Sequence, residues 1–200
     1  MLLPELESWK SEGAFLTTTL FDHSVFYKTY GYANAAPEKT LLLLHGFPES
    51  SFSYHKIING MRQYFDHIVL FDMIGYGLSA KPVTDYGYSL AEQADIALQV
   101  WKHLGVTGAH LLAHDMGNSV ATELIARHVS GILPGWFSAG FQSFTLTNGS
   151  IVLELANLRI TQKILLSKHG RRFSGLVNYK LFSQQVRSAH GNNDLSEKDL

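Results

Sequence analysis

The sequence predicts an α/β fold: a mostly parallel sheet flanked by helices, with an antiparallel hairpin at its N-terminal side. Short, continuous apolar runs are typical of strands that are buried on both faces of a parallel sheet. Helical patterns separate these runs, and strand–helix alternation favours βαβ units with right-handed crossovers. The three runs are Leu41–Leu44, Ile68–Phe71 and Leu111–Ala113.

Two further β signals precede the parallel strands, and one follows them. Residues 14–21 and 25–30 are rich in β-forming side chains, and Asp22–Ser24 supplies turn residues between them. This pattern predicts the antiparallel hairpin. Residues 141–147 predict a further strand.

Three helices are expected between the strands. The first covers Ser53–Tyr64 and is weakly patterned. The second begins after Ser89, which has capping-box spacing to Glu92, and ends at Gly105. Its apolar residues recur three and four positions apart, as in an amphipathic helix. The third covers about Gly117–Val129.

Composition limits the class of protein. Hydrophobic residues make up 46% of the 200 residues and charged residues 16%, which excludes intrinsic disorder. The net charge of −1 predicts no strong field that would attract nucleic acid. No cysteine is present, so disulfides and thiolate metal sites are excluded. We find no firm membrane signal and no signal peptide, so the compartment stays open, with the cytoplasm as the default.

The strand pattern stops after Asn148, which predicts two domains. Residues 1–150 are expected to form the N-terminal part of an α/β core, and residues 151–200 a partial helical subdomain that begins with an apolar helix over 151–166. Residues 196–199 have a helix N-cap with nothing after Leu200, so we expect the sequence to stop inside an element that a longer chain would complete.

The sharpest chemical signal is the junction of the third buried run with the third helix. Ala113 and Gly117 are small residues two positions on either side of Asp115. This is the spacing of a nucleophile elbow, in which small neighbours permit a strained turn at the carboxyl end of a strand. The N–H of the next residue, Met116, then lies at a helix N-terminus, where developing negative charge is stabilised.

A simpler interpretation is that Asp115 only caps this helix, because Asp is a favoured N-cap. The loop after the first buried run favours the catalytic interpretation. There, His45–Pro48 can supply a second oxyanion donor, the backbone N–H of Phe47. We expect His45 itself to be a structural hydrogen-bonding group rather than a base.

A dinucleotide site is the competing interpretation of the segment after the second buried run. Gly75, Gly77 and Ala80 fit the glycine-rich fingerprint. Such a site needs a helix to begin there, and Lys81-Pro82 falls inside that position. Because proline in a helix interior costs about 3 kcal/mol, we reject this interpretation and expect no cofactor.

Together, His45–Ser50, Asp72–Pro82 and His114–Gly117 resemble the α/β-hydrolase superfamily, over about residues 14–150. Within it, they resemble the Asp-nucleophile branch of epoxide hydrolases and haloalkane dehalogenases. The most similar subgroup is the mesoderm-specific transcript proteins. The resemblance identifies the second domain as a cap, within which the sequence stops.

The resemblance implies a two-step mechanism. Asp115 displaces a leaving group at saturated carbon and forms an alkyl-enzyme ester, whose oxyanion is held by the N–H groups of Phe47 and Met116. A His with a carboxylate partner then activates water. In family order, the His and its carboxylate partner follow the cap, so we expect the His beyond Leu200. Some relatives carry the carboxylate directly after the strand that follows the nucleophile helix, but Asn148 stands at that position here. We therefore expect the carboxylate beyond Leu200 as well.

The resemblance also directs the choice of reaction. Dehalogenases of this branch usually place Trp after the nucleophile to hold the halide, whereas Met116 has no donor. We therefore expect epoxide-like C–O hydrolysis of a small apolar organic substrate, without a metal, with Tyr179 as a weak candidate acid. The alternatives are a truncated, non-catalytic scaffold or binding protein, and a haloalkane dehalogenase.

Overall fold

The structure is a computed structural model that describes residues 4–19, 22–149, 160, 163–164, 167–170, 172, 180 and 183–184. The chain divides into two units, one of residues 2–153 and one of residues 154–200 with Met1. Most of the helix expected over 151–166, the candidate Tyr179 and the N-cap over 196–199 lie outside the described residues.

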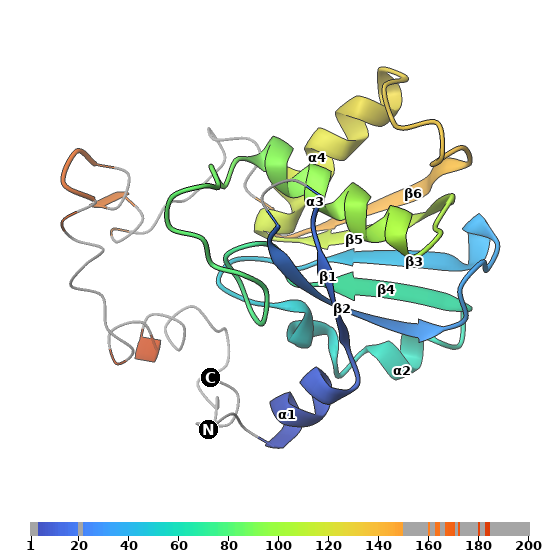
Figure 1. Cartoon of the computed structure of the whole chain (residues 1–200), viewed down its shortest axis with the longest axis horizontal. Coiled ribbons are helices and arrows are strands. Elements are labelled where there is room, and N and C mark those ends of the chain that lie inside the picture. The colour runs from blue at the N-terminus through green and yellow to red at the C-terminus, as the bar shows by residue number, and fades with distance from the viewer. Residues whose placement is uncertain are drawn as a thin grey trace. The chain divides into compact units, whose positions relative to one another are not determined.

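Within the described residues the sheet has six strands in the order β1-β2-β4-β3-β5-β6 (Figure 1). The pairs β1–β2 and β2–β4 are antiparallel, whereas β4–β3, β3–β5 and β5–β6 are parallel. The predicted fold class, with its antiparallel hairpin and parallel sheet, is therefore confirmed. The strands are β1 (Ala14–Thr17), β2 (Ser24–Gly31), β3 (Thr40–Leu44), β4 (His67–Phe71), β5 (Gly108–His114) and β6 (Gly140–Thr147).

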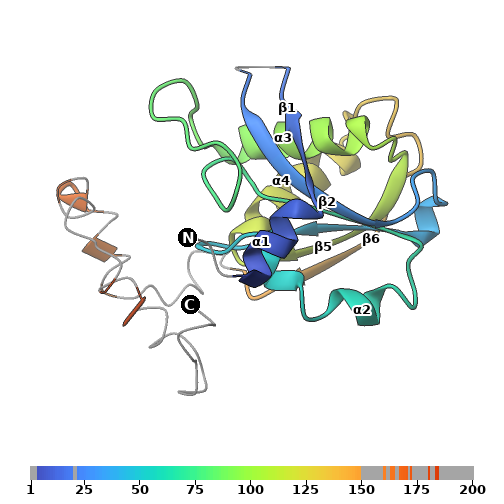
Figure 2. The ribbon, with the colours of Figure 1, turned by 60° about the horizontal axis from the view of Figure 1, so that its bottom comes forward.

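Helices cover both faces of the sheet. Figure 2 shows α3 and α4 on one face and α2 on the other. The expected capping box of α3 is present: the Ser89 hydroxyl accepts from the Glu92 N–H at 3.2 Å, and the Glu92 carboxylate accepts from the Ser89 N–H at 2.9 Å. The helices are α1 (Pro4–Ser11), α2 (Ile58–Met61), α3 (Leu90–His103) and α4 (Met116–Val129).

The core lies in two layers, because successive side chains of a strand point to opposite faces. Leu42 and Leu44 of β3 pack in the cluster that contains Trp101 of α3. Leu41 and Leu43 pack in the other cluster, with residues of α1 and α2. All five residues of β3 are buried, as the continuous apolar run predicts. This rigid central sheet fixes the positions of the loops that follow β3, β4 and β5.

The prediction of one helix over residues 53–64 is wrong. A 3₁₀ turn, Ser51–Tyr54, and the single-turn helix α2 replace it. The Ser50 hydroxyl accepts from the Phe52 N–H at 3.3 Å and begins the 3₁₀ turn, and the Tyr54 hydroxyl donates to the Leu44 carbonyl at 2.9 Å. Tertiary hydrogen bonds thus override a weak helical pattern. The strand expected over 14–21 is also shorter, since β1 ends at Thr17.

A buried lysine of strand β2 contacts Trp9 of helix α1. This helix was not predicted from the sequence. Lys28 is 3% exposed, and its ammonium group donates to the Glu12 carboxylate at 2.7 Å. The same ammonium lies 4.2 Å from the ring centre of Trp9 on α1. A buried charge is tolerated when it is paired and hydrogen-bonded.

This ion pair predicts unequal effects of removing its two members. Glu12→Gln leaves the Lys28 ammonium buried without its counter-charge, whereas Lys28→Met removes that charge and fills the space with an apolar chain. We therefore expect Glu12→Gln to destabilise the protein more than Lys28→Met does. Urea unfolding midpoints measure the difference, with exposed Glu7→Gln on α1 as control. Equal midpoints for Glu12→Gln and Glu7→Gln would contradict the expectation.

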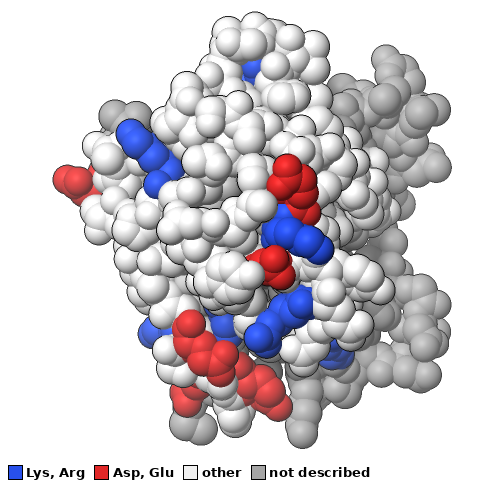
Figure 3. All heavy atoms as spheres, turned by 90° about the vertical axis from the view of Figure 1, so that its right-hand side faces the viewer, with Lys and Arg blue, Asp and Glu red and all other residues white. Residues whose placement is uncertain are grey.

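Charges on the surface are dispersed. On the face shown in Figure 3, acidic and basic side chains lie beside one another, and much of the surface is uncharged. In the part of the chain that the structure describes, no helix is long and apolar enough to cross a bilayer.

Candidate active site

Three loops meet at one edge of the sheet. They follow β3, β4 and β5, three adjacent parallel strands whose carboxyl ends lie at the same edge. Ligand sites of open α/β sheets form at this edge. The loops carry the three segments that the sequence analysis singled out, at residues 45–50, 72–82 and 114–117.

The turn between β5 and α4 has the geometry of an elbow. Asp115 has a φ of 50° and a ψ of −118°, a conformation that is strained for a residue with a side chain. A Cβ atom on Gly117 would lie 2.5 Å from the Leu44 carbonyl oxygen and 2.6 Å from that of His45. Only glycine permits this close approach of α4 to the end of β3.

The Asp115 carboxylate points to the loop after β3. Its Oδ1 accepts from the Met116 N–H at 2.6 Å and from the Phe47 N–H at 2.9 Å. None of the described residues donates to Oδ2. The helix-cap interpretation and the interpretation with two amide donors therefore describe the same contacts. Asp115 caps α4 with Oδ1, the oxygen that accepts from the N–H groups of both Phe47 and Met116. A Cβ on Gly46 would lie 2.6 Å from the Asp115 Cβ, so this contact also requires glycine.

His45 has both ring nitrogens occupied. Nε2 accepts from the Met73 N–H at 2.9 Å, so the ring proton is on Nδ1, which donates to the Gly46 carbonyl at 2.9 Å. Burial lowers the pKa of the His45 ring. The ring therefore connects the loops after β3 and β4 as a neutral group, as expected of a structural histidine.

The lowered pKa of His45 predicts a pH effect on stability. The unfolded chain binds a proton near the ordinary histidine pKa of about 6.5, whereas the folded protein does so only at lower pH. Stability from the neutral ring is therefore complete above about pH 6.5 and is lost as the pH falls towards the folded pKa. NMR of the imidazole nitrogens is expected to show His45 still as the neutral Nδ1–H form when the pH falls below the ordinary histidine pKa of about 6.5. Protonation of His45 at its ordinary pKa in the folded protein would contradict this.

Asp72, whose role sequence reasoning did not identify, holds the loops in place. It is 1% exposed, and its two carboxylate oxygens accept from the Ser51 and Leu78 N–H groups, each at 2.7 Å. The Ser79 hydroxyl donates to the Asp72 carbonyl at 2.6 Å and accepts from the Phe26 N–H at 2.9 Å. The sequence did contain a signal for this role, because Asp72 directly follows a buried strand. A carboxylate at such a position can be buried only when it is strongly hydrogen-bonded.

Asn118, in the first turn of α4, connects the elbow to the end of β6. Its Nδ2 donates to the Thr147 carbonyl at 2.8 Å, and the Asp115 N–H donates to the same carbonyl at 3.0 Å. Asn148, where an acid was considered, directly follows β6 with a φ of 54°. No sequence pattern marked Asn118, because its role depends on contact with β6.

Two aromatic residues, Tyr76 and Phe47, lie in the loops that reach the elbow. The Tyr76 hydroxyl donates to the Met116 sulfur at 3.4 Å. Burial raises the pKa of Tyr76, and the nearby Tyr88 and Asp115 raise it further. The Tyr76 ring lies perpendicular to that of Phe47, with centres 6.2 Å apart. Phe47 is 57% exposed although its N–H binds Asp115.

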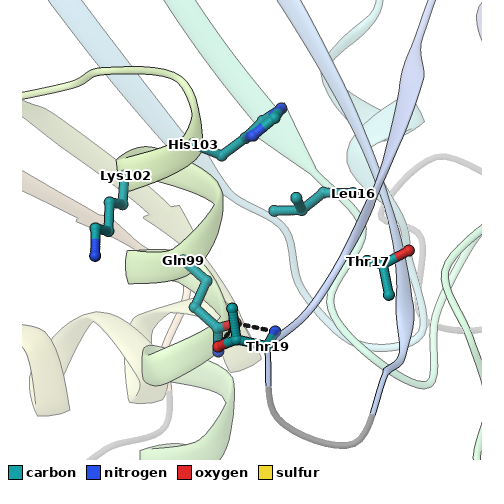
Figure 4. Close-up of a pocket in the computed structure, with 6 residues that line it drawn as sticks. All are labelled: Leu16, Thr17, Thr19, Gln99, Lys102 and His103. Carbon is teal, nitrogen blue, oxygen red and sulfur yellow. Dashed lines mark hydrogen bonds between the residues drawn. The ribbon is translucent and has the colours of Figure 1, made fainter.

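A separate cavity of about 360 Å³ lies between β1 and the second half of α3 (Figure 4). Its polar groups already bind one another: the Thr19 N–H and hydroxyl both donate to the Gln99 side-chain oxygen, at 2.9 and 3.0 Å. It contains no carboxylate or elbow, so the edge with Asp115 is the better candidate. In the described part of the chain, no group of three His, Asp or Glu residues could hold a metal ion. The cavity is lined by Leu16, Thr17, Thr19, Gln99, Lys102 and His103.

Comparison with known proteins identifies the family of the chain. Residues 39–189 match the alpha/beta hydrolase fold family. The chain is 39% identical over 179 residues to a protein named as hydrolase LipZ of Mycobacterium tuberculosis, covering 89% of this chain and 57% of that protein. It is 36% identical over 199 residues to the human mesoderm-specific transcript homolog protein, covering 95% and 56%.

A soluble epoxide hydrolase of a Corynebacterium species is 28% identical over 135 residues, covering 62% of this chain and 46% of that protein. The chain thus spans about half the length of these relatives. The family match covers most of the chain, and the observed sheet has the predicted parallel strands and hairpin. The resemblance inferred from the motifs is confirmed: this chain belongs to the alpha/beta hydrolase fold family.

Proposed function

We propose that this protein is a hydrolase that acts through an Asp115 nucleophile and opens carbon–oxygen bonds of small apolar epoxides. One observation carries the proposal: two backbone amides hold Oδ1 of Asp115, while none of the described residues donates to Oδ2. A carboxylate that served only as a helix cap would not need the second amide, which comes from a loop 68 residues away in sequence.

In the first step, Oδ2 attacks a ring carbon of the epoxide. A bond forms between Oδ2 and that carbon, the ring C–O bond breaks, and the released oxygen takes up a proton from solvent, which the second step returns. The product is a β-hydroxyalkyl ester of Asp115. The N–H groups of Phe47 and Met116 hold Oδ1, which becomes the carbonyl oxygen of the ester.

In the second step, water attacks the ester carbonyl carbon and the negative charge moves to Oδ1. The two amides already lie at hydrogen-bonding distance from this oxygen, so no rearrangement is needed to stabilise the charge. As the bond between the carbonyl carbon and Oδ2 breaks, Oδ2 takes up the proton that the base removed from water, the diol leaves, and the regenerated Asp115 carboxyl group loses its remaining proton to solvent. His45 is unsuitable as the base because both of its ring nitrogens are bonded. We therefore assign the base and its acid partner to the part of the protein that follows the cap in family order.

The choice of an epoxide over a haloalkane depends on the residue after the nucleophile. A departing halide needs strong donors, and the Met116 thioether has none. The Tyr76 hydroxyl, which donates to the Met116 sulfur, is a single and weakly bound donor. One such donor suits the oxygen released from an epoxide ring better than it suits a halide ion. The named epoxide hydrolase among the relatives supports the same choice.

Mass spectrometry of the protein incubated with an epoxide tests the proposal. We expect a covalent adduct on the peptide that contains Asp115. Its mass equals that of the whole epoxide, because ring opening releases no leaving group. A brief acid quench preserves the ester, and hydroxylamine is expected to cleave it.

The pattern of adducts separates the candidate functions. Absence of both the adduct and the diol product, in protein that is folded and contains every residue of the full chain, supports a non-catalytic scaffold and overturns the proposal. Faster reaction with a matched haloalkane, with loss of hydrogen halide from the adduct mass, supports dehalogenation instead. An adduct on any residue other than Asp115 also overturns it.

A further inference from the structure

Three aromatic residues lie in two of the loops that reach the elbow at Asp115: the Phe47 N–H binds the Asp115 carboxylate, the Tyr76 hydroxyl binds Met116, and Tyr88 packs on Gly75. Phe47 follows β3, whereas Tyr76 and Tyr88 belong to the segment after β4. We call Phe47, Tyr76 and Tyr88 the aromatic collar. Two of its members are exposed, Phe47 by 57% and Tyr88 by 42%, although large apolar side chains are usually buried.

Phe47 cannot move away from the carboxylate without breaking a site contact. Its own N–H donates to Asp115 Oδ1 at 2.9 Å, so the start of its side chain is fixed beside the reacting group. The Tyr76 ring fixes its other side, perpendicular at 6.2 Å between ring centres. Tyr76 packs in turn against His45, at 5.5 Å between ring centres. The Phe47 ring is therefore more than half exposed, contacts Tyr76 on one side, and extends from a backbone that the Asp115 carboxylate binds.

Tyr88 is fixed by a backbone contact and a hydrogen bond. Its ring lies so close to Gly75 that a Cβ there would be 2.6 Å from the Tyr88 ring. Its hydroxyl donates to the Pro82 carbonyl at 2.7 Å. Tyr76 links these residues to the elbow: besides burial, Tyr88 and the Asp115 carboxylate both raise the pKa of Tyr76, and its hydroxyl donates to the Met116 sulfur.

We propose that the aromatic collar selects substrates in which an aromatic ring is attached to the epoxide, with Phe47 as the residue that determines this specificity. This inference rests on the proposed function, because it concerns the substrate of the same site. Perpendicular and offset contacts between aromatic rings add an attraction of their own to the burial of their area. A saturated ring of the same size gains the burial but not this added contribution.

Two probe epoxides of matched shape measure the selectivity. Styrene oxide carries a phenyl ring, and cyclohexyloxirane carries the saturated ring in its place. The measured quantity is the ratio of their rates of adduct formation on Asp115, first in the native protein and then in Phe47→Leu. Dividing one ratio by the other cancels the different intrinsic reactivities of the probes. Phe47→Leu keeps the backbone N–H that binds Asp115.

We expect Phe47→Leu to lower the phenyl-to-cyclohexyl ratio roughly twofold to tenfold, from the strength of ring–ring contacts. Tyr64→Leu is the matched control, because Tyr64 is an aromatic residue that is 69% exposed outside the collar, and its ratio should equal that of the native protein. A general fall in both rates at a constant ratio indicates a structural role for Phe47 and overturns the inference.

The outcomes also separate this inference from the proposed function. If neither probe gives an Asp115 adduct or a diol product in the native protein, the proposed function fails. If both probes react but Phe47→Leu leaves their ratio unchanged, the function stands and the aromatic selectivity is wrong.

Discussion

Asp115→Asn is expected to abolish adduct formation with epoxides while leaving the fold intact. The asparagine oxygen can accept from the same two amides, which bind Asp115 Oδ1 in the native protein at 2.6 and 2.9 Å. An amide nitrogen then replaces Oδ2, and it is not a nucleophile. Asn also tolerates positive φ better than most residues with a Cβ, so the turn with φ of 50° is retained. We expect the rate of adduct formation to fall roughly 10⁴-fold or more, as for loss of other catalytic nucleophiles.

The measurement is the time course of adduct mass, with circular dichroism and urea unfolding to verify the fold. Asp66→Asn is the control, because Asp66 is exposed and lies before β4, away from the elbow. Its rate should equal that of the native protein. Persistent adduct formation in folded Asp115→Asn protein would show that another residue reacts.

The second large effect is on stability. Asp72→Ala removes the acceptor for the Ser51 and Leu78 N–H groups, which are bonded at 2.7 Å each. Each buried donor that loses its partner costs about 1–3 kcal/mol, so we expect the free energy of unfolding to fall by about 4 kcal/mol. Urea unfolding, followed by tryptophan fluorescence, measures this change.

Two companion variants test the cause of that loss. Asp72→Asn keeps one acceptor oxygen but directs an NH₂ group at the other amide, so its stability should lie below that of the native protein. Asp66→Ala, at an exposed carboxylate, should change stability by less than about 0.5 kcal/mol. A loss below about 1 kcal/mol for Asp72→Ala would mean that solvent replaces its contacts.

Long, strongly patterned elements could be predicted from the sequence. Strands β3 and β4 are buried on both faces and β5 is largely so, and their continuous apolar runs identified them. The capping box of α3 depends on two residues that are close in sequence, and it was predicted correctly. Asp115 was found for the same reason, because an elbow needs small residues at fixed local positions.

Features that depend on contacts between distant segments could not be predicted. The expected helix over 53–64 is broken because the Tyr54 hydroxyl binds the end of β3 and Asp72 holds Ser51. Asn118 contributes through a carbonyl 29 residues away. Helix α1 has a weak pattern of its own, and its burial depends on Trp9 and on the Lys28 ion pair.

The two oxygens of a carboxylate are equivalent in water, but the fold makes those of Asp115 different. One is held by two amides and the other is not. Under the proposed mechanism, the unheld atom departs with each product, and an atom from solvent replaces it. The held atom remains through every cycle. In isotopically labelled water, the first diol released would therefore carry an oxygen from the protein itself, and the label would reach products only from the second cycle onward.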